Sequence, residues 1–234
     1  HTLQHLNSKK DIVYFQTYGG GGVGVGLMLG PLGVAANIKM IESSTMKDVA
    51  VLNDKISLDP AKIFMNSANK SGFAVRSPAS NKLYRLNPYV LVEKTENDVI
   101  MLASVVLVDY VGSKNKYQGR YLVQLPVTYS ISELASLSAA KSSQLETLVG
   151  EGFSTLLSRM KAEATATPEL EQNITSTSEF LTPRFKFEIP GKLIEKNDTY
   201  TWIRTSTGVF GVRNADINIK MPGQKTKPKK ADKD

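Results

Sequence analysis

The chain of 234 residues contains no cysteine and only two histidines, His1 and His5. The lack of cysteine excludes disulfides, thiolate nucleophiles and thiolate metal ligands. Both histidines lie in the polar first ten residues, so neither a Ser-His-Asp triad nor a histidine metal site can be assembled in the folded body. We therefore expect no metal, no cofactor and no catalytic residue, which favours a non-enzymatic protein.

A hydrophobic run long enough to span a membrane is also lacking. The longest apolar stretch covers residues 23–38 and is interrupted by Pro31 and Asn37. A membrane-spanning helix needs about 20 apolar residues. The stretch therefore predicts an interfacial or re-entrant segment, an element of an oligomeric assembly, or a glycine-rich piece buried beneath the protein's own sheet.

Glycine is concentrated in one place. Eight of the 17 glycines lie between positions 19 and 33, and Gly22, Gly26 and Gly30 stand four residues apart. Small residues at this period lie along one helix face and allow another backbone to approach closely. Together with the apolar Leu27 and Leu29, they predict a surface that packs against a membrane or a partner.

The same run contains the pattern Gly19-x-Gly21-x-x-Gly24 after a predicted strand over 11–17, which matches a dinucleotide-binding fingerprint. The alternative hypothesis is therefore a nucleotide- or phosphate-binding protein using the Gly19–Gly24 loop. The fingerprint requires a second, parallel strand with an acidic residue about 20 positions further on. The sequence shows no such strand, and the nearest acid, Glu42, lies in a helical setting.

The middle of the chain predicts three strands, over 89–95, 99–111 and 117–129, joined by short turns. This arrangement indicates an antiparallel meander, and the nearly continuous apolar residues of 99–111 predict a central strand covered on both faces. Ser130 and Glu133 form a capping box that opens a helix predicted over 130–163. Its leucine-rich face is expected to pack on the meander.

The carboxyl-terminal part predicts short strands over 185–189, 193–195, 200–205, 209–213 and 217–220. Residues 198–217, with Trp202, Gly208 and Gly211, resemble the hairpins of bacterial SH3-like modules, which implies a small partial barrel. Tyr200, Trp202 and Phe210 are candidates for an aromatic binding face, and core packing is the alternative for the same side chains.

Acidic and basic residues add few site candidates. Glu93, Glu96, Asp98 and Asp109 fall at predicted strand ends and turns, where solvated carboxylates are expected, and Asp109 is the candidate for burial. The net charge is +7, of which the lysine-rich tail 223–234 supplies +3. That tail lacks arginine and interleaved aromatics, so we expect it to be disordered and do not expect a nucleic-acid partner.

The predicted fold is α+β, an antiparallel β-meander packed by a long amphipathic helix, with a carboxyl-terminal β-rich, SH3-like unit and a glycine-rich amino-terminal segment. The expected parts are a lead and short strand (1–17), the glycine-rich segment (18–41), an α+β core (42–167), the β-rich unit (168–222) and the tail (223–234).

The expected function is that of a structural or assembly protein of the cell envelope, in the periplasm or associated with the outer membrane. The start at His1 is typical of a processed chain. A membrane or an envelope protein is the expected partner, with homo-oligomerisation as an open alternative.

Overall fold

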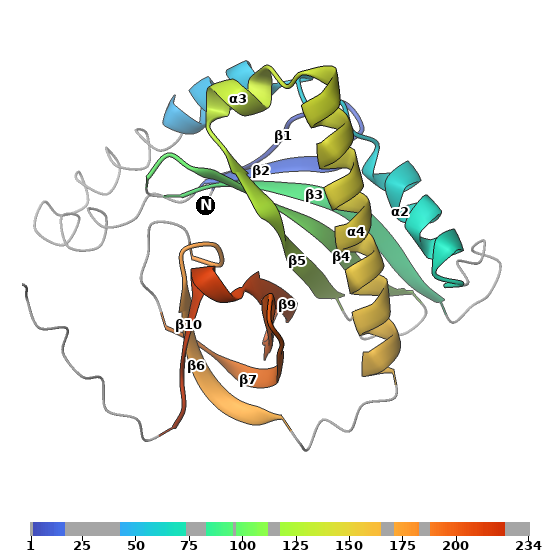
Figure 1. Ribbon diagram of the computed structural model, residues 1–234, viewed down its shortest axis with the longest axis vertical. Helices are drawn as coiled ribbons and strands as arrows, with labels where there is room; N and C mark the ends of the chain where they lie inside the picture. Colours follow the sequence, from blue (N-terminus) through green and yellow to red (C-terminus); the bar gives the residue numbers. More distant parts are fainter. Residues whose placement is uncertain are drawn as a thin grey trace, which may run out of the picture.

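The computed structural model describes residues 2–16, 43–73, 83–95, 97–111, 118–164, 171–182 and 188–222 (Figure 1). The glycine segment, which we define as residues 18–41, and the lysine-rich tail therefore lie outside the described residues. The five-part division of the chain stays a prediction.

Ten described strands form one sheet in the order β1-β2-β3-β4-β5-β9-β8-β7-β6-β10. Their bounds are β1 Thr2–His5, β2 Ile12–Gln16, β3 Leu83–Lys94, β4 Ile100–Val111, β5 Gln118–Tyr129, β6 Gln172–Ser178, β7 Ile189–Lys196, β8 Tyr200–Thr205, β9 Gly208–Arg213 and β10 Ile217–Lys220. A short 3-10 turn, η2 (Asn214–Asp216), joins the last two.

The predicted architecture of a meander with a separate β-rich unit is wrong. Strands β3, β4 and β5 do pair antiparallel, but β2 joins β3 in parallel and β9 joins β5 in parallel. The β8–β9 hairpin forms, yet it extends the same sheet and does not close into a separate SH3-like barrel. Parallel neighbours must come from distant parts of the chain, so local turn signals did not reveal them.

The long helix is also divided. The capping box at Ser130 and Glu133 is confirmed, but it opens only the short α3 (Ile131–Ala135). A second helix, α4 (Ala139–Glu163), begins after Ser138, whose side chain accepts a hydrogen bond from the Lys141 amide. Serine at both N-cap positions explains why the chain can stop one helix and start another within three residues.

Two further helices precede the central strands. Residues 43–52 are helical, and α2 (Pro60–Lys70) begins at the N-cap Asp59, with Pro60 in its first turn. Among the described residues, no helix is both long and apolar enough to cross a bilayer.

The helices cover one face of the sheet, and Figure 1 shows α4 running across it beside α2. The helix-side core includes Tyr14, Val92, Leu102, Phe153 and Trp202. Phe64 of α2 meets Phe153 of α4 edge to face, with ring centroids 5.4 Å apart. This contact fixes the two helices against each other as well as against the sheet.

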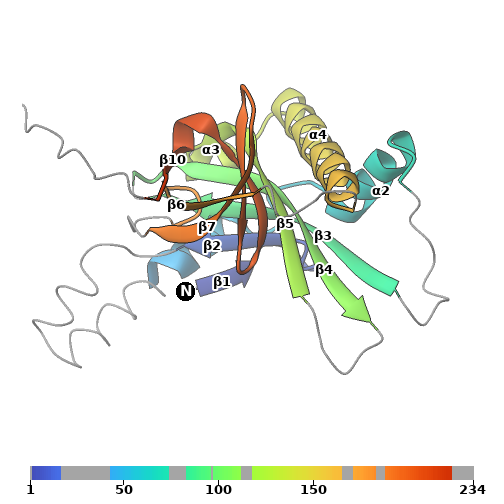
Figure 2. The same cartoon turned by 90° about the horizontal axis from the view of Figure 1, so that it is seen from below.

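The opposite face has a core of its own. The strand-side core joins Leu91, Ala103 and Leu122 of the central strands to Ile203 and Phe210 of the carboxyl-terminal strands. The sheet must therefore curl so that its last strands pack over its own centre, as seen from below in Figure 2. Strand β4 is covered on both faces, as the sequence predicted.

Two strands were missed. Residues 172–178, for which the sequence predicted no strand, form β6, and its buried side chains are Ile174, Ser176 and Ser178. Residues 2–5, expected to be part of a flexible lead, form the edge strand β1. In both cases the residues are mainly polar, so an apolar alternation was too weak to mark a strand.

Candidate functional site at the base of the glycine segment

The carboxyl ends of β2 and β3 lie side by side, and β2 ends two residues before the glycine segment in the sequence. Gln16, the last residue of β2, lies opposite Lys94, the last residue of β3, in the parallel register. Since Tyr14 belongs to the helix-side core, the alternation of strand side chains places Gln16 on the same face. This face of the sheet therefore ends in polar side chains.

The helix over 43–52 brings two more polar side chains to this point, just after the glycine segment. Thr45 is fully buried, and Asp48 is only 9% exposed. The Thr45 hydroxyl donates to the Gln16 amide oxygen at 3.3 Å. A hydrogen bond thus joins a residue before the glycine segment to a residue after it.

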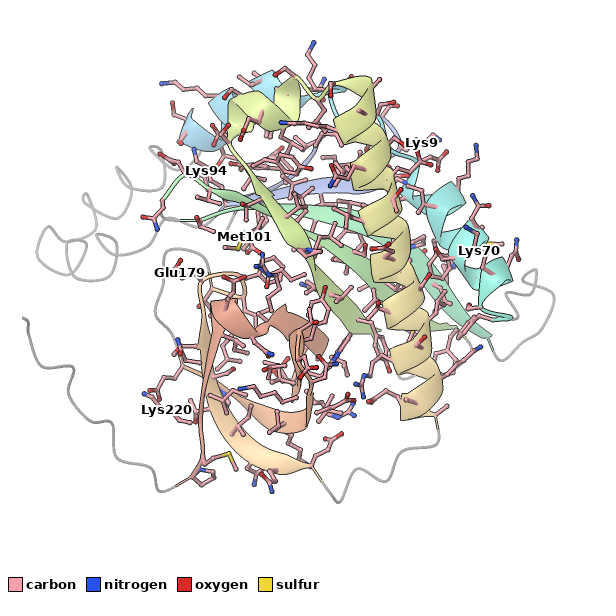
Figure 3. All side chains as sticks on the ribbon, in the orientation of Figure 1. Lys9, Lys70, Lys94, Met101, Glu179 and Lys220 are labelled. Atoms are coloured by element: carbon pink, nitrogen blue, oxygen red, sulfur yellow. The ribbon has the colours of Figure 1, made fainter. Side chains whose placement is uncertain are left out.

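A buried ion pair completes the cluster. The Lys94 ammonium lies 3.0 Å from the Asp48 carboxylate and 3.1 Å from the exposed carboxylate of Asp98. The Tyr14 hydroxyl lies 2.7 Å from Asp48 Oδ2 and 3.0 Å from Gln16 Oε1. Lys94 marks the position of this cluster in Figure 3. We call Tyr14, Gln16, Thr45, Asp48 and Lys94 the base network.

The base network is costly to separate, and it presents little net charge to a ligand. A buried cation paired with a carboxylate and a tyrosine hydroxyl is costly to separate, because each group would lose its partner away from water. The single ammonium faces two carboxylates, so it carries no net positive charge to a ligand. The network therefore joins described residues on either side of the glycine segment to each other and to the sheet.

A second buried acid lies next to Lys94 but on the other face. Glu93 is 3% exposed, beside Met101 of β4 and Phe15 of β2 in the sheet register. Burial raises the pKa of its carboxyl well above its ordinary value, and the charge of Arg120 lowers it in part. The expectation of a solvated acid at this position is wrong, because Glu93 lies next to the end of β3 but its side chain is buried.

The other acidic candidates that the structure describes are more exposed than Glu93. Asp98 is exposed and pairs with Lys94, and Glu96 lies outside the described residues. Asp109, the predicted candidate for burial, is partly exposed and accepts a hydrogen bond from the Asn87 amide at 2.8 Å. Within the described ranges, no group of three or more His, Asp or Glu side chains is placed to hold a metal ion.

The structure does not bring the three aromatic candidates together. Trp202 is buried in the helix-side core, with the Arg159 guanidinium 4.7 Å from its ring centroid. Tyr200 is partly buried beside it, at 6.3 Å between ring centroids. Phe210 belongs to the strand-side core, on the opposite face of the sheet. Gly211 gives the Trp202 ring its space, since a Cβ there would lie 2.8 Å from ring carbons.

An ion cluster lies where α4 meets the carboxyl-terminal strands. Arg204 of β8 binds Glu163 at the end of α4 and both carboxylate oxygens of Glu171. The hydrogen bonds from Arg204 lower the pKa of Glu171. Arg204 also borders a shallow hollow of about 410 Å³ between β6, β7 and β8, with Asn173 and Lys192. Since its charge is already balanced, Arg204 serves to join the end of α4 to the carboxyl-terminal strands.

The glycine candidates Gly22, Gly26, Gly30, Leu27 and Leu29, and the Gly19–Gly24 loop, lie outside the described residues. Sequence reasoning missed the base network because its members come from three distant places in the chain. One feature of the sequence did point to this site. Lys94 follows Val90 and Val92 at two-residue spacing, so the strand pattern places a lysine on an apolar face.

Comparisons with protein-family models, with curated proteins and with solved structures found no match for this chain.

Proposed function

We propose that the protein is a non-enzymatic structural or assembly protein of the cell envelope, in which the glycine segment packs against a membrane or a partner. The observation that carries the proposal is the base network, which ties the residues on either side of the segment to one another and to the sheet. A segment that is flanked on both sides by fixed residues loses less conformational entropy when it associates than a free tail would.

The composition of the segment supports the same role. Gly22, Gly26 and Gly30 recur at the interval that permits close packing of backbones, and the residues between them are apolar. Leu27 and Leu29 supply apolar contact area beside the glycines. The proposed location is extracytoplasmic, in the periplasm or at the outer membrane.

A substitution series tests the association surface. Gly26→Leu and Gly30→Leu are expected to lower association at least tenfold, because a leucine side chain prevents close approach of the partner. Gly24→Leu is the matched control, since it makes the same change in the same segment but outside the four-residue period. Light scattering after size exclusion measures self-assembly, and flotation with membranes measures membrane association. Equal behaviour of all three variants would overturn the proposal.

One observation favours the second candidate function, nucleotide or phosphate binding through the Gly19–Gly24 loop. Strands β2 and β3 are parallel and are connected through the helix over 43–52 and α2, so the glycine run follows the first strand of a βαβ arrangement. The expected lack of a second parallel strand is thus corrected. The paired state of Lys94 argues against this function, since an anion would meet two carboxylates at that edge.

Thermal unfolding with added ATP or inorganic phosphate separates the two functions. The envelope role predicts no change in the unfolding temperature. A saturable increase that Gly21→Leu abolishes would support the phosphate-binding role instead.

A further inference from the structure

Two charged side chains on the strand-side face of the sheet lack a partner of opposite charge. The Glu93 side chain is 3% exposed, and among the described residues it takes part in no hydrogen bond or ion pair. Arg120 of β5 is half-buried, and its Nε atom is buried without a hydrogen-bond partner in the same part of the chain. Buried polar groups in native proteins are nearly always hydrogen-bonded, so these two groups need an explanation.

The two groups lie close to each other and to a tyrosine hydroxyl. Tyr89 and Glu93 stand two residues on either side of Leu91, so strand alternation places all three side chains on the strand-side face. Arg120 stands two residues before Leu122, which belongs to the same core. Burial raises the pKa of both the Tyr89 hydroxyl and the Glu93 carboxyl, and the charge of Arg120 lowers each pKa in part. The Arg120 guanidinium is therefore near enough to act on both groups.

The other acid on this face does not pair with Arg120. Asp109 of β4 accepts a hydrogen bond from Asn87, and no ion pair between described residues joins Asp109 to Arg120. A guanidinium stays charged at every physiological pH, whereas the surroundings of Glu93 favour the neutral carboxyl. The group formed by Tyr89, Glu93 and Arg120 therefore carries excess positive charge, which favours an anion.

Apolar side chains surround this group. Val105 of β4 lies in register with Tyr89 of β3 on one side and with Leu122 of β5 on the other, and Phe210 of β9 follows Leu122. Val105, Leu122 and Phe210 are buried, whereas Tyr89 and Arg120 are half-buried, so the polar groups lie where the strand-side core reaches the surface. Sites for small molecules typically combine such an apolar lining with a few convergent polar groups.

We infer that Tyr89, Glu93 and Arg120 form a binding site for the carboxylate of a small apolar acid. The Arg120 guanidinium and the Tyr89 hydroxyl donate hydrogen bonds to the carboxylate, and the protonated carboxyl of Glu93 supplies a third donor. The short hydrocarbon tail contacts Val105 and Leu122. The inference goes beyond the proposed function and does not depend on it, because it uses no residue of the glycine segment or of the base network.

Titration of the full chain with hexanoate, followed through its backbone amide signals by NMR, tests the inference. Saturable shifts are expected on β3, β4 and β5 around Tyr89, Val105 and Arg120. Arg120→Met removes the charge and should weaken binding at least about tenfold. Tyr89→Phe removes one donor and should weaken binding about threefold, whereas Glu93→Gln keeps a donor and should bind within about threefold of wild type. Arg85→Met is the matched control, because Arg85 is an exposed arginine on the same face of β3, and it should bind hexanoate as wild type does.

A second ligand and a second variant sharpen the result. Hexanol has the same number of carbons as hexanoate but no charge, and it should bind at least about tenfold more weakly. Arg120→Lys keeps the charge but loses the planar pair of donors, so it should weaken hexanoate binding even if Arg120→Met does not fold. Circular dichroism verifies the folding of each variant.

Four outcomes would each overturn the inference. The first is the absence of saturable shifts at any hexanoate concentration at which the chain stays folded. The second is equal affinity for hexanol and hexanoate, which would show that the carboxylate is not recognised. The third is wild-type affinity in both Arg120 variants. The fourth is an equal loss in Arg120→Met and Arg85→Met, which would mean that hexanoate responds only to the net charge of the protein.

Discussion

The helix-side and strand-side faces of the sheet both bury a charged residue, and they accommodate it in different ways. Lys94 and Glu93 are neighbours on β3 and face opposite cores. Lys94 has a carboxylate partner in Asp48, which compensates for its burial inside the protein. Burial dominates the environment of Glu93 and favours its protonated form. The helix-side face thus holds a buried ion pair, whereas the strand-side face favours the neutral form of its buried carboxyl.

The largest expected effect on the free energy of unfolding comes from removing the carboxylate partner of Lys94. Asp48→Ala removes the partner of a buried ammonium and should lower the free energy of unfolding by about 3–5 kcal/mol. Asp98→Ala is the comparison, because Asp98 binds the same ammonium from an exposed position and should cost less than about 1 kcal/mol. Urea denaturation measures both. Similar losses in the two variants would mean that Lys94 is more accessible to water than the structure indicates.

The next effect concerns the contact between α4 and the helix-side face. A Cβ at Gly152 would lie 2.5 Å from Ser104 Oγ and 2.9 Å from a Leu125 methyl carbon. Gly152→Ala should therefore cost about 1–3 kcal/mol through overpacking.

Gly150, two residues earlier on α4, is the matched control. Its nearest neighbour, an Ile63 methyl carbon, would be 3.5 Å from an added Cβ, which is an ordinary contact. Gly150→Ala should stabilise the protein by up to about 1 kcal/mol, since alanine favours the helix more than glycine does. Thermal or urea unfolding of the two variants shows directly whether each substitution raises or lowers the stability. A stabilising Gly152→Ala would show that α4 can move away from β4.

The smallest expected effect tests the strand-side face through pH. Because the pKa of Glu93 is raised in the folded protein, folding favours its protonated form. The stability of the wild type should then fall as the pH rises from the ordinary carboxyl pKa through the raised value of the folded state. Glu93→Gln stays neutral at every pH, so it should unfold at a higher urea concentration than wild type at pH 7 and show little difference near pH 4. A parallel pH dependence of the two proteins would contradict the burial of a titrating carboxyl.

The parts of the fold that were predictable depend on neighbours in sequence. The capping box of Ser130 and Glu133, the helix start at Asp59 and Pro60, and the doubly covered strand β4 all follow from local patterns. The glycines at 150 and 152 indicated either a kink or a close contact of the helix, and the structure places only Gly152 in a close contact.

The remaining features depend on distant parts of the chain. The parallel pairs β2–β3 and β5–β9 join segments separated by helices, and no local turn identifies such neighbours. The base network likewise needs Gln16, Asp48 and Lys94 to meet in space before their roles can be recognised. Strand β6 was missed because Ser176 and Ser178 are buried polar residues, which an apolar pattern does not detect.

The parallel pairing of β5 with β9 has a consequence for the way the chain is made. Tyr121 of β5 cannot pair with Val209 of β9 until that residue is synthesised, about 90 residues later. At about 5–20 residues per second, this delay lasts roughly 4–18 s, during which β5 is an unpaired edge with the apolar Leu122 and Val123 at its centre. The nascent chain therefore passes through a period in which one edge of β5 is open to pairing with other chains. A chaperone that covers β5 during this period should increase the yield of folded protein.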